Sequence, residues 1–190
     1  RLVIVILYKM KKALFAFFCL VAFVFADNKW GSDIPGVVKL VHTNEKVIYL
    51  TFDACGGGGG YKYDEKLIEF LKAEKIEATL FINSRWIDHN METFVSLSKN
   101  PLFSIQNHGT EHRPLSFVPR KIYGIAATGS AEKTKQEIMG NHEKIKKLTG
   151  AAPRFFRSGT AYYDDASVKL AGELGYKIIG FDVLGDGGAT

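Results

Sequence analysis

Residues 47–64 read VIYLTFDACGGGGGYKYD, and this stretch decides how the rest of the chain is interpreted. Its first six residues are β-branched, aromatic or apolar, which is typical of a buried strand, here expected over 46–52. The run then stops at a single carboxylate, Asp53, followed by Ala54, the thiol of Cys55 and five glycines. Glycine loses more backbone entropy on folding than any other residue, so five in succession do not stabilise a fold. The pattern indicates a strand end whose backbone is kept open for a functional reason.

Strand-like and helix-like segments alternate along the rest of the chain. The further expected strands are 78–84, 102–106, 154–158 and 176–183, and the expected helices are 64–75, 91–99, 131–150 and 165–175. Strands that alternate with helices at this pace predict an α/β fold, with parallel strands joined by crossover helices. In such folds functional residues gather at the carboxyl ends of the strands.

The composition is that of an ordinary globular domain, and it argues against a nucleic-acid partner. The chain has 190 residues, of which 46% are hydrophobic and 24% charged, and a formal net charge of +5. Four of these positive charges lie in residues 1–26, which contain no acidic residue; they are Arg1, Lys9, Lys11 and Lys12. Because the remainder is near neutral, no nucleic-acid binding is predicted.

Residues 1–26 are predicted to be an export signal, with residues 1–9 as an upstream extension. Basic residues at 11 and 12 precede an apolar stretch at 13–25, and cleavage is expected after Ala26. A retained membrane anchor is the alternative, but three lysines interrupt the apolar run. Residues 27–190 would then be secreted or periplasmic, with no stable membrane insertion after cleavage. Cys55 would be the single thiol, which excludes an intrachain disulfide.

Side chains with catalytic or metal-binding chemistry follow the expected strand ends. They are Asp53, His108, His112, Arg157, Asp182 and Asp186. A spacing of four lets His108 and His112 reach one Zn²⁺ if the loop takes a helical turn. The same letters read H-x-x-E-H, an inverted zinc-peptidase motif with Glu111 as the general base. That motif needs a continuous helix, which Gly109 and Pro114 disfavour.

Four of these segments resemble the motifs of the polysaccharide deacetylases with the NodB homology domain, carbohydrate esterase family 4. TFDACGG is similar to the family's T-F-D-D-G, HGTEH to H-[ST]-x-x-H, FFRSGT to its arginine motif and FDVLGD to its aspartate motif. The resemblance covers residues 45–186. It implies a distorted (β/α) barrel with fewer than eight strands. It also implies an exported hydrolase that removes acetyl groups from an acetylated glycan with a divalent metal, Zn²⁺ first and Co²⁺ or Ni²⁺ as alternatives.

The resemblance also implies a role for each site residue. His108 and His112 would be metal ligands, and Asp53 would be the general base that activates the attacking water. Arg157 would hold Asp53 in its ionised form, and Asp182 would orient Arg157.

The chain departs from the family pattern in three places. The second aspartate, which is the family's carboxylate ligand, is Ala54 here, so Asp53, Cys55 or water is left to complete the metal shell. Of these we expect Asp53 beside the metal, as ligand or as base, with Cys55 a nearby onlooker. Ser158 and Gly159 replace prolines of the third motif. No Leu-x-His strand follows the fourth motif, so the barrel is expected to be incomplete at its C-terminus.

These departures keep a second interpretation open, a deacetylase-like glycan-binding protein without catalysis. The remaining histidines, His42, His89 and His142, are expected on the surface. Tyr162 and Tyr163 are expected either to line a sugar platform or to pack in the fold.

Overall fold

The computed structural model describes residues 29–57 and 60–185. Within these residues six parallel strands form one sheet: β2 (Val37–Val38), β3 (Thr51–Ala54), β4 (Ala78–Ile82), β5 (Phe103–Asn107), β8 (Phe155–Phe156) and β10 (Lys177–Ile179). The helices are α2 (Glu65–Ala73), α3 (Ser84–His89), α4 (Met91–Ser98), α5 (Ala131–Thr149) and α6 (Asp165–Glu173). Two small antiparallel pairs join β1 (Trp30–Gly31) to β9 (Tyr163–Asp164) and β6 (Lys121–Ile122) to β7 (Ile125–Ala126).

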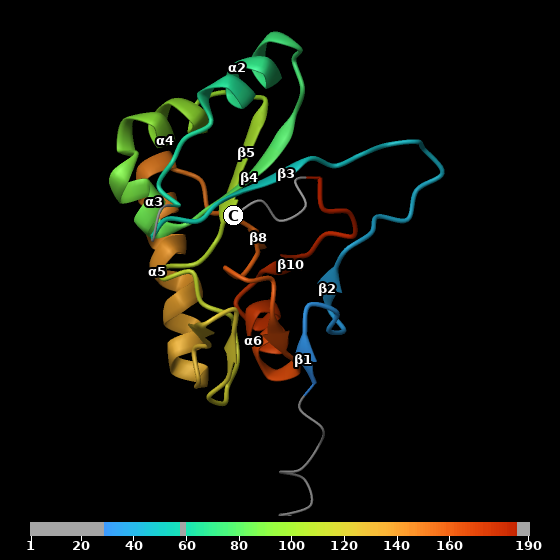
Figure 1. Ribbon diagram of the computed structural model, residues 1–190, viewed down its shortest axis with the longest axis vertical. Coiled ribbons are helices and arrows are strands. Elements are labelled where there is room, and N and C mark those ends of the chain that lie inside the picture. The colour runs from blue at the N-terminus through green and yellow to red at the C-terminus, as the bar shows by residue number, and fades with distance from the viewer. Residues whose placement is uncertain (1–28, 58–59, 186–190) are drawn as a thin grey trace, which may run out of the picture.

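The main sheet is curled into an open half-barrel (Figure 1). Its strand order is β2-β10-β8-β5-β4-β3. Arg157, just after β8, shows the curl, because its guanidinium donates both to Thr51 and Asp53 on β3 and to the carbonyls of Ile179 and Gly180 at the end of β10. In a flat sheet β3 would lie three strands, about 14 Å, from β8, which is beyond the reach of an arginine side chain.

Four of the five described helices agree with the sequence pattern, and two of the strands differ from it. Helices α2, α4, α5 and α6 begin and end within two residues of the expected positions, whereas α3 was not expected. The expected buried strand at 46–52 is wrong over its first half. Its ladder with β4 begins only at Thr51, and Ile48 is 87% exposed, because β3 lies at the edge of the described sheet. The strand expected at 176–183 is paired only over 177–179.

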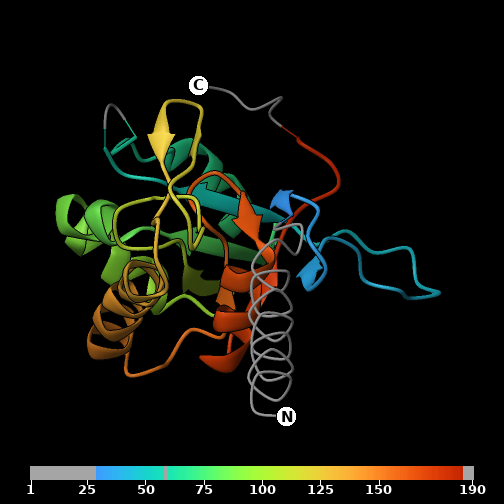
Figure 2. The ribbon, with the colours of Figure 1, turned by 90° about the horizontal axis from the view of Figure 1, so that it is seen from below.

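Two hydrophobic clusters hold the helices against the sheet. One joins α2, α3 and α4 to β4 and β5, with Trp86 and Phe94 fully enclosed. The other joins α5 and α6 to β8 and β10, with Ile138, Phe156 and Tyr163 fully enclosed. Figure 2 shows the orange α5 beside the green helices α3 and α4 outside the sheet. The burial of Tyr163 rules it out as part of a sugar platform and places it in the core.

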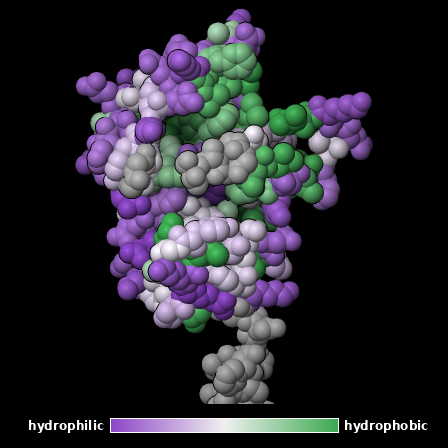
Figure 3. All heavy atoms as spheres, in the orientation of Figure 1, coloured by the Kyte–Doolittle hydropathy of each residue, from purple (hydrophilic) through white to green (hydrophobic). Residues whose placement is uncertain are grey.

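Exposed apolar side chains gather on the segment that projects beside β3 (Figure 3). They are Leu40, Val41, Val47, Ile48 and Tyr49. Within residues 29–57 and 60–185, no helix has the length and apolar character needed to cross a membrane. The predicted export signal at 1–26 and the candidate residue Asp186 lie outside the described residues.

Candidate active site

His108 follows β5 and is placed so that one ring nitrogen is free to bind a ligand. The side chain is 1% exposed, and its Nδ1 donates to the carbonyl oxygen of Arg157 at 2.9 Å. Burial lowers the pKa of His108, so the ring is neutral and Nε2 keeps its lone pair. Nε2 lies 3.7 Å from Sγ of Cys55 and 3.9 Å from Oδ2 of Asp53. A neutral imidazole whose other nitrogen is held by a carbonyl is the form that binds metals in proteins.

His112 brings a second imidazole to the same place. Its ring meets that of His108 edge to face, with centroids 4.9 Å apart. Its Nε2 is buried and has no hydrogen-bond partner among the described residues. Burial first, and then the proximity of His108 and Arg85, lower the pKa of His112 to about 3. A buried polar atom without a partner is destabilising by about 1–3 kcal/mol, and a bound cation would satisfy it.

The loop that carries both histidines has an unusual backbone path. Gly109 has a φ of 80° and His112 a φ of 63°, both in the left-handed region. A Cβ on Gly159 would overlap the carbonyl oxygen of His112, so the residue that replaces a family proline makes room for this loop. Residues 108–114 are not helical, which removes the geometry that the inverted peptidase motif needs. The Glu111 carboxylate also turns to Nε of Arg113, at 2.6 Å.

Buried polar side chains of α5 and of the residue before α3 hold the loop that carries both histidines. Glu137 on α5 is 4% exposed, and its carboxylate accepts the backbone N–H groups of Glu111 and Arg113 at 2.9–3.1 Å. Asn83, which caps α3, donates to the carbonyls of His108 and Gly109. Sequence reasoning missed both anchors. Glu137 lies in a charged helix that reads as solvated, and Asn83 reads as the end of a strand.

Asp53 and Arg157 form the charged half of the site. Nη1 of Arg157 donates to Oδ1 of Asp53 at 2.7 Å, and Arg157 is only 2% exposed. Its guanidinium also lies over the ring of Phe81, 4.3 Å from the centroid. The arginine therefore fixes the direction of the carboxylate and leaves Oδ2 turned toward His108.

Asp182 is placed differently from its expected role. It is exposed, and the hydrogen bonds of the Arg157 side chain end instead on Thr51, Asp53 and the carbonyls of Ile179 and Gly180. Backbone oxygens at the end of β10 thus orient the guanidinium. A catalytic role of Asp182 stays a prediction.

Cys55 completes a compact group of ligand atoms. Its Sγ and one ring nitrogen each of His108 and His112 all lie within 4.8 Å of one another, and Asp53 is not a member of this group. Burial first, and then the charge of Asp53, raise the pKa of the Cys55 thiol to about 11. The loop behind it is closed by the bonds Gly56 N to Gly60 O and Gly60 N to Gly57 O.

The three other histidines of the described chain lie apart from the site. His142 is half-buried rather than on the surface, and its Nδ1 lies 2.7 Å from the Tyr176 hydroxyl, whereas His42 and His89 are exposed as predicted.

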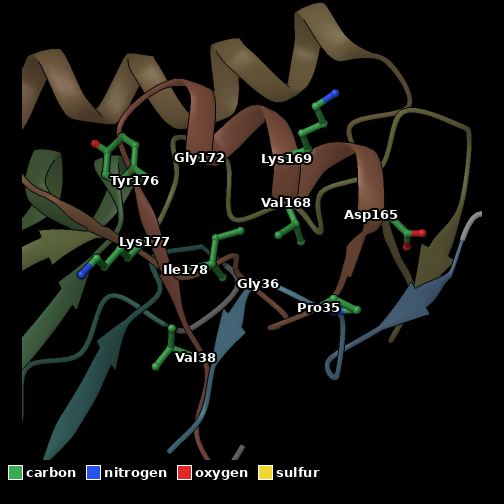
Figure 4. Close-up of a pocket in the computed structure, with 10 residues that line it drawn as sticks. All are labelled: Pro35, Gly36, Val38, Asp165, Val168, Lys169, Gly172, Tyr176, Lys177 and Ile178. Carbon is green, nitrogen blue, oxygen red and sulfur yellow. The ribbon is translucent and has the colours of Figure 1, made fainter. Parts of the chain in front are cut away.

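A groove of about 480 Å³ lies between α6, β2 and β10, with Val168 and Ile178 in its wall (Figure 4). None of the candidate catalytic or metal-binding residues lines it.

Comparison with known proteins decides the family. The model of the polysaccharide deacetylase family matches residues 41–179. The chain belongs to the polysaccharide deacetylase family. The matched region contains Asp53, both site histidines and Arg157, so the resemblance seen in the sequence motifs is confirmed.

The individual relatives of this family member are distant. A peptidoglycan-N-acetylglucosamine deacetylase of Bacillus cereus is 29% identical over 139 residues, covering 73% of this chain and 58% of that protein. The structure of a family 4 carbohydrate esterase from Bacillus anthracis aligns with a TM-score of 0.63 at 26% identity, over 76% of this chain and 63% of that one. A family 4 pseudoenzyme from the same organism aligns with a TM-score of 0.61 at 21% identity, over 78% and 47%.

These matches confirm the barrel-type α/β fold. Other curated relatives have similar coverage, and the chain spans about half the length of the first ones it matches.

Proposed function

We propose that this polysaccharide deacetylase is a metal-dependent hydrolase that removes acetyl groups from an acetylated glycan, such as peptidoglycan or a chitin-like polymer. One observation carries the proposal. The Arg157-bound carboxylate of Asp53 faces Nε2 of His108 at 3.9 Å, beside a second imidazole, that of His112, whose buried Nε2 has no hydrogen-bond partner among the described residues. A base and a pair of metal-binding nitrogens thus lie within reach of one bound group.

The chain's own residues divide the chemistry between them. His108 and His112 would hold the ion, and Zn²⁺, or Co²⁺ or Ni²⁺ in its place, supplies polarisation of the acetyl carbonyl and a lowered pKa of the attacking water. Asp53 accepts the proton of that water through Oδ2 while Arg157 holds Oδ1. Gly56 lets the chain after β3 pass close to α3, since a Cβ there would lie 2.7 Å from the backbone nitrogen of Trp86.

We place the protein in the cell envelope, secreted or periplasmic. The support is the signal-like composition of residues 1–26 and the acetylated cell-wall substrate of the Bacillus cereus relative. The deacetylase domain would then be residues 27–190, and its partner is the glycan alone.

Acetate release tests the proposal. The full chain is incubated with acetylated chitooligosaccharides and with peptidoglycan, with chelator and after return of Zn²⁺. We expect release that the chelator abolishes and Zn²⁺ restores, and a loss of about a hundredfold or more in Asp53→Asn. His42→Ala, which changes an exposed histidine outside the site, should retain full activity. Release that is indifferent to chelator and to Asp53→Asn would contradict the proposal.

A glycan-binding protein without catalysis is the second candidate, and Ala54 favours it. An alanine stands where the family pattern has its carboxylate ligand, and one fold relative is described as a pseudoenzyme. A surface for binding exists, since Tyr162 packs against Trp30 and Tyr123, with ring centroids 5.6 and 5.9 Å apart. Aromatic faces suit sugar rings. Glycan binding by calorimetry without acetate release from any polymer would favour this candidate.

A further inference from the structure

We infer that Cys55 is the third protein ligand of the metal site, so that a Cys/His/His set holds Zn²⁺ and Asp53 is left as the base. The inference rests on the proposed metal-dependent function, and it names the ligand set of that same site. It replaces the expectation that Cys55 is a nearby onlooker.

The separations of the ligand atoms fit zinc. With Zn–S near 2.3 Å and Zn–N near 2.1 Å, a tetrahedral ion places a sulfur and a nitrogen ligand about 3.6 Å apart. Sγ of Cys55 lies 3.7 Å from Nε2 of His108. All three ligand atoms, including that of His112, lie within 4.8 Å of one another, so small side-chain rotations would bring them to one ion.

The alternative third ligand, Asp53, is already engaged. Its Oδ1 accepts a 2.7 Å hydrogen bond from a buried arginine that is itself held by two backbone carbonyls. Among the described residues Asp53 does not belong to the compact group of ligand atoms. Sγ of Cys55, by contrast, contacts Nε2 of His108 at 3.7 Å, and an ion bound there would replace that contact.

Charge also favours the thiolate. With Ala54 in the chain, His108 and His112 are neutral ligands, and two imidazoles alone leave both charges of a divalent ion uncompensated. When Zn²⁺ binds, the Cys55 thiol would release its proton to solvent, and the resulting thiolate would supply one negative charge at the site. Thiolate sulfur is a soft ligand that selects zinc over magnesium, calcium and manganese. The set therefore predicts a zinc protein that the hard cations do not load.

Cobalt substitution tests the ligand set directly. The metal-free full chain is titrated with Co²⁺, and the near-ultraviolet thiolate-to-cobalt charge-transfer absorption is recorded. We expect this absorption at one equivalent in the native chain and in Cys19→Ser, the matched control at the other cysteine. Cys55→Ser should lack it and should bind Zn²⁺ at least about 100-fold more weakly, since even losses outside the ligand shell reach that size. Cys55→Asp should still bind Zn²⁺, and its Co²⁺ complex should lack the thiolate absorption.

Alkylation gives a second measurement that needs no change at Cys55. Because burial raises the pKa of the Cys55 thiol to about 11, the reaction is run at alkaline pH. Iodoacetamide should then modify Cys55 in the metal-free chain, and one equivalent of Zn²⁺ should protect it. His112→Ala should remove the protection, and His42→Ala should not. A cobalt complex without thiolate absorption, unchanged Zn²⁺ affinity in Cys55→Ser, or equal alkylation with and without Zn²⁺ would each overturn the inference. An empty site in Asp53→Asn beside a filled one in Cys55→Ser would do the same.

The two proposals fail separately. Thiolate absorption without acetate release from any glycan would sustain the ligand set and defeat the hydrolase. Chelator-sensitive acetate release with unchanged Zn²⁺ affinity in Cys55→Ser would sustain the hydrolase and defeat the ligand set.

Discussion

The two loops that form the site are held in different ways. The histidine loop, residues 108–113, rests on the buried side chains of Glu137 and Asn83. The glycine loop, residues 55–57 and 60 of the described chain, is closed by two bonds between its own backbone groups. Arg85 alone among the described side chains donates to both loops, to the carbonyls of Gly56 and Glu111.

This difference teaches which ligands are fixed in advance. Side chains locked by packing and buried hydrogen bonds hold a geometry before the ligand arrives. His108 and His112 are therefore held in place before a ligand binds, whereas the backbone after Cys55 is held by bonds of the glycine loop itself and by Arg85. We expect substitutions that disturb the support of the histidine loop to lower the stability more than a substitution beside the glycine loop.

The largest effect is expected for Glu137→Ala. The substitution removes the acceptor of the backbone N–H groups of Glu111 and Arg113 and empties a buried position. The substitution leaves two backbone N–H groups without their acceptor, so the free energy of unfolding should fall by roughly 2–4 kcal/mol. Urea denaturation measures it. Glu132→Ala, at an exposed position of the same helix, is the control, and equal effects in the two variants would contradict the anchor.

Gly159→Ala should come next. The added methyl group would overlap the backbone of His112, so the loop must shift. Overpacking of this kind is destabilising by about 1–3 kcal/mol. Thermal unfolding measures the loss, and Zn²⁺ affinity should fall with it. Gly172→Ala, where a methyl group would meet open space, should be neutral or stabilising.

The anchor should also respond to pH. Burial raises the pKa of Glu137 from 4.5 to about 7. Between these values the folded state holds a proton that the unfolded state has released, so this group's contribution to stability falls as pH rises from 4.5 to 7. Glu137→Gln should flatten that part of the pH profile in the metal-free protein. An unchanged slope would show that another group titrates there.

Arg85→Met should have the smallest effect. It removes the bond to Gly56 at 3.3 Å and that to Glu111 at 2.8 Å while keeping an unbranched apolar side chain at the position. We expect a loss of about 1 kcal/mol or less in stability. The alkylation rate of Cys55 in the metal-free chain should fall, because Arg85 lowers the pKa of this thiol and its loss leaves less thiolate. Lys66→Met at an exposed position of α2 is the control. A stability loss above that of Glu137→Ala would reverse the comparison.

The sequence predicted the site where a strand-end rule applies. Asp53 lies near the end of β3, and His108 and Arg157 directly follow β5 and β8. The structure brings the three together. Glu137 could not be found this way, because a glutamate in a lysine-rich helix looks solvated until the loop that packs on it is known. The segment before β3 was predicted to be a buried strand, and this prediction is wrong over 46–50. Its apolar pattern predicts burial, but its position beside the sheet edge decides its exposure.

Arg157 has a consequence for how the molecule opens. Its side chain ties the end of β3 to the end of β10, and these strands are not neighbours in the sheet. Local unfolding of either strand therefore breaks bonds that also restrain the other. In hydrogen exchange the amides of the two strands should share one protection level and lose it together, as a single cooperative unit that spans both hydrophobic clusters.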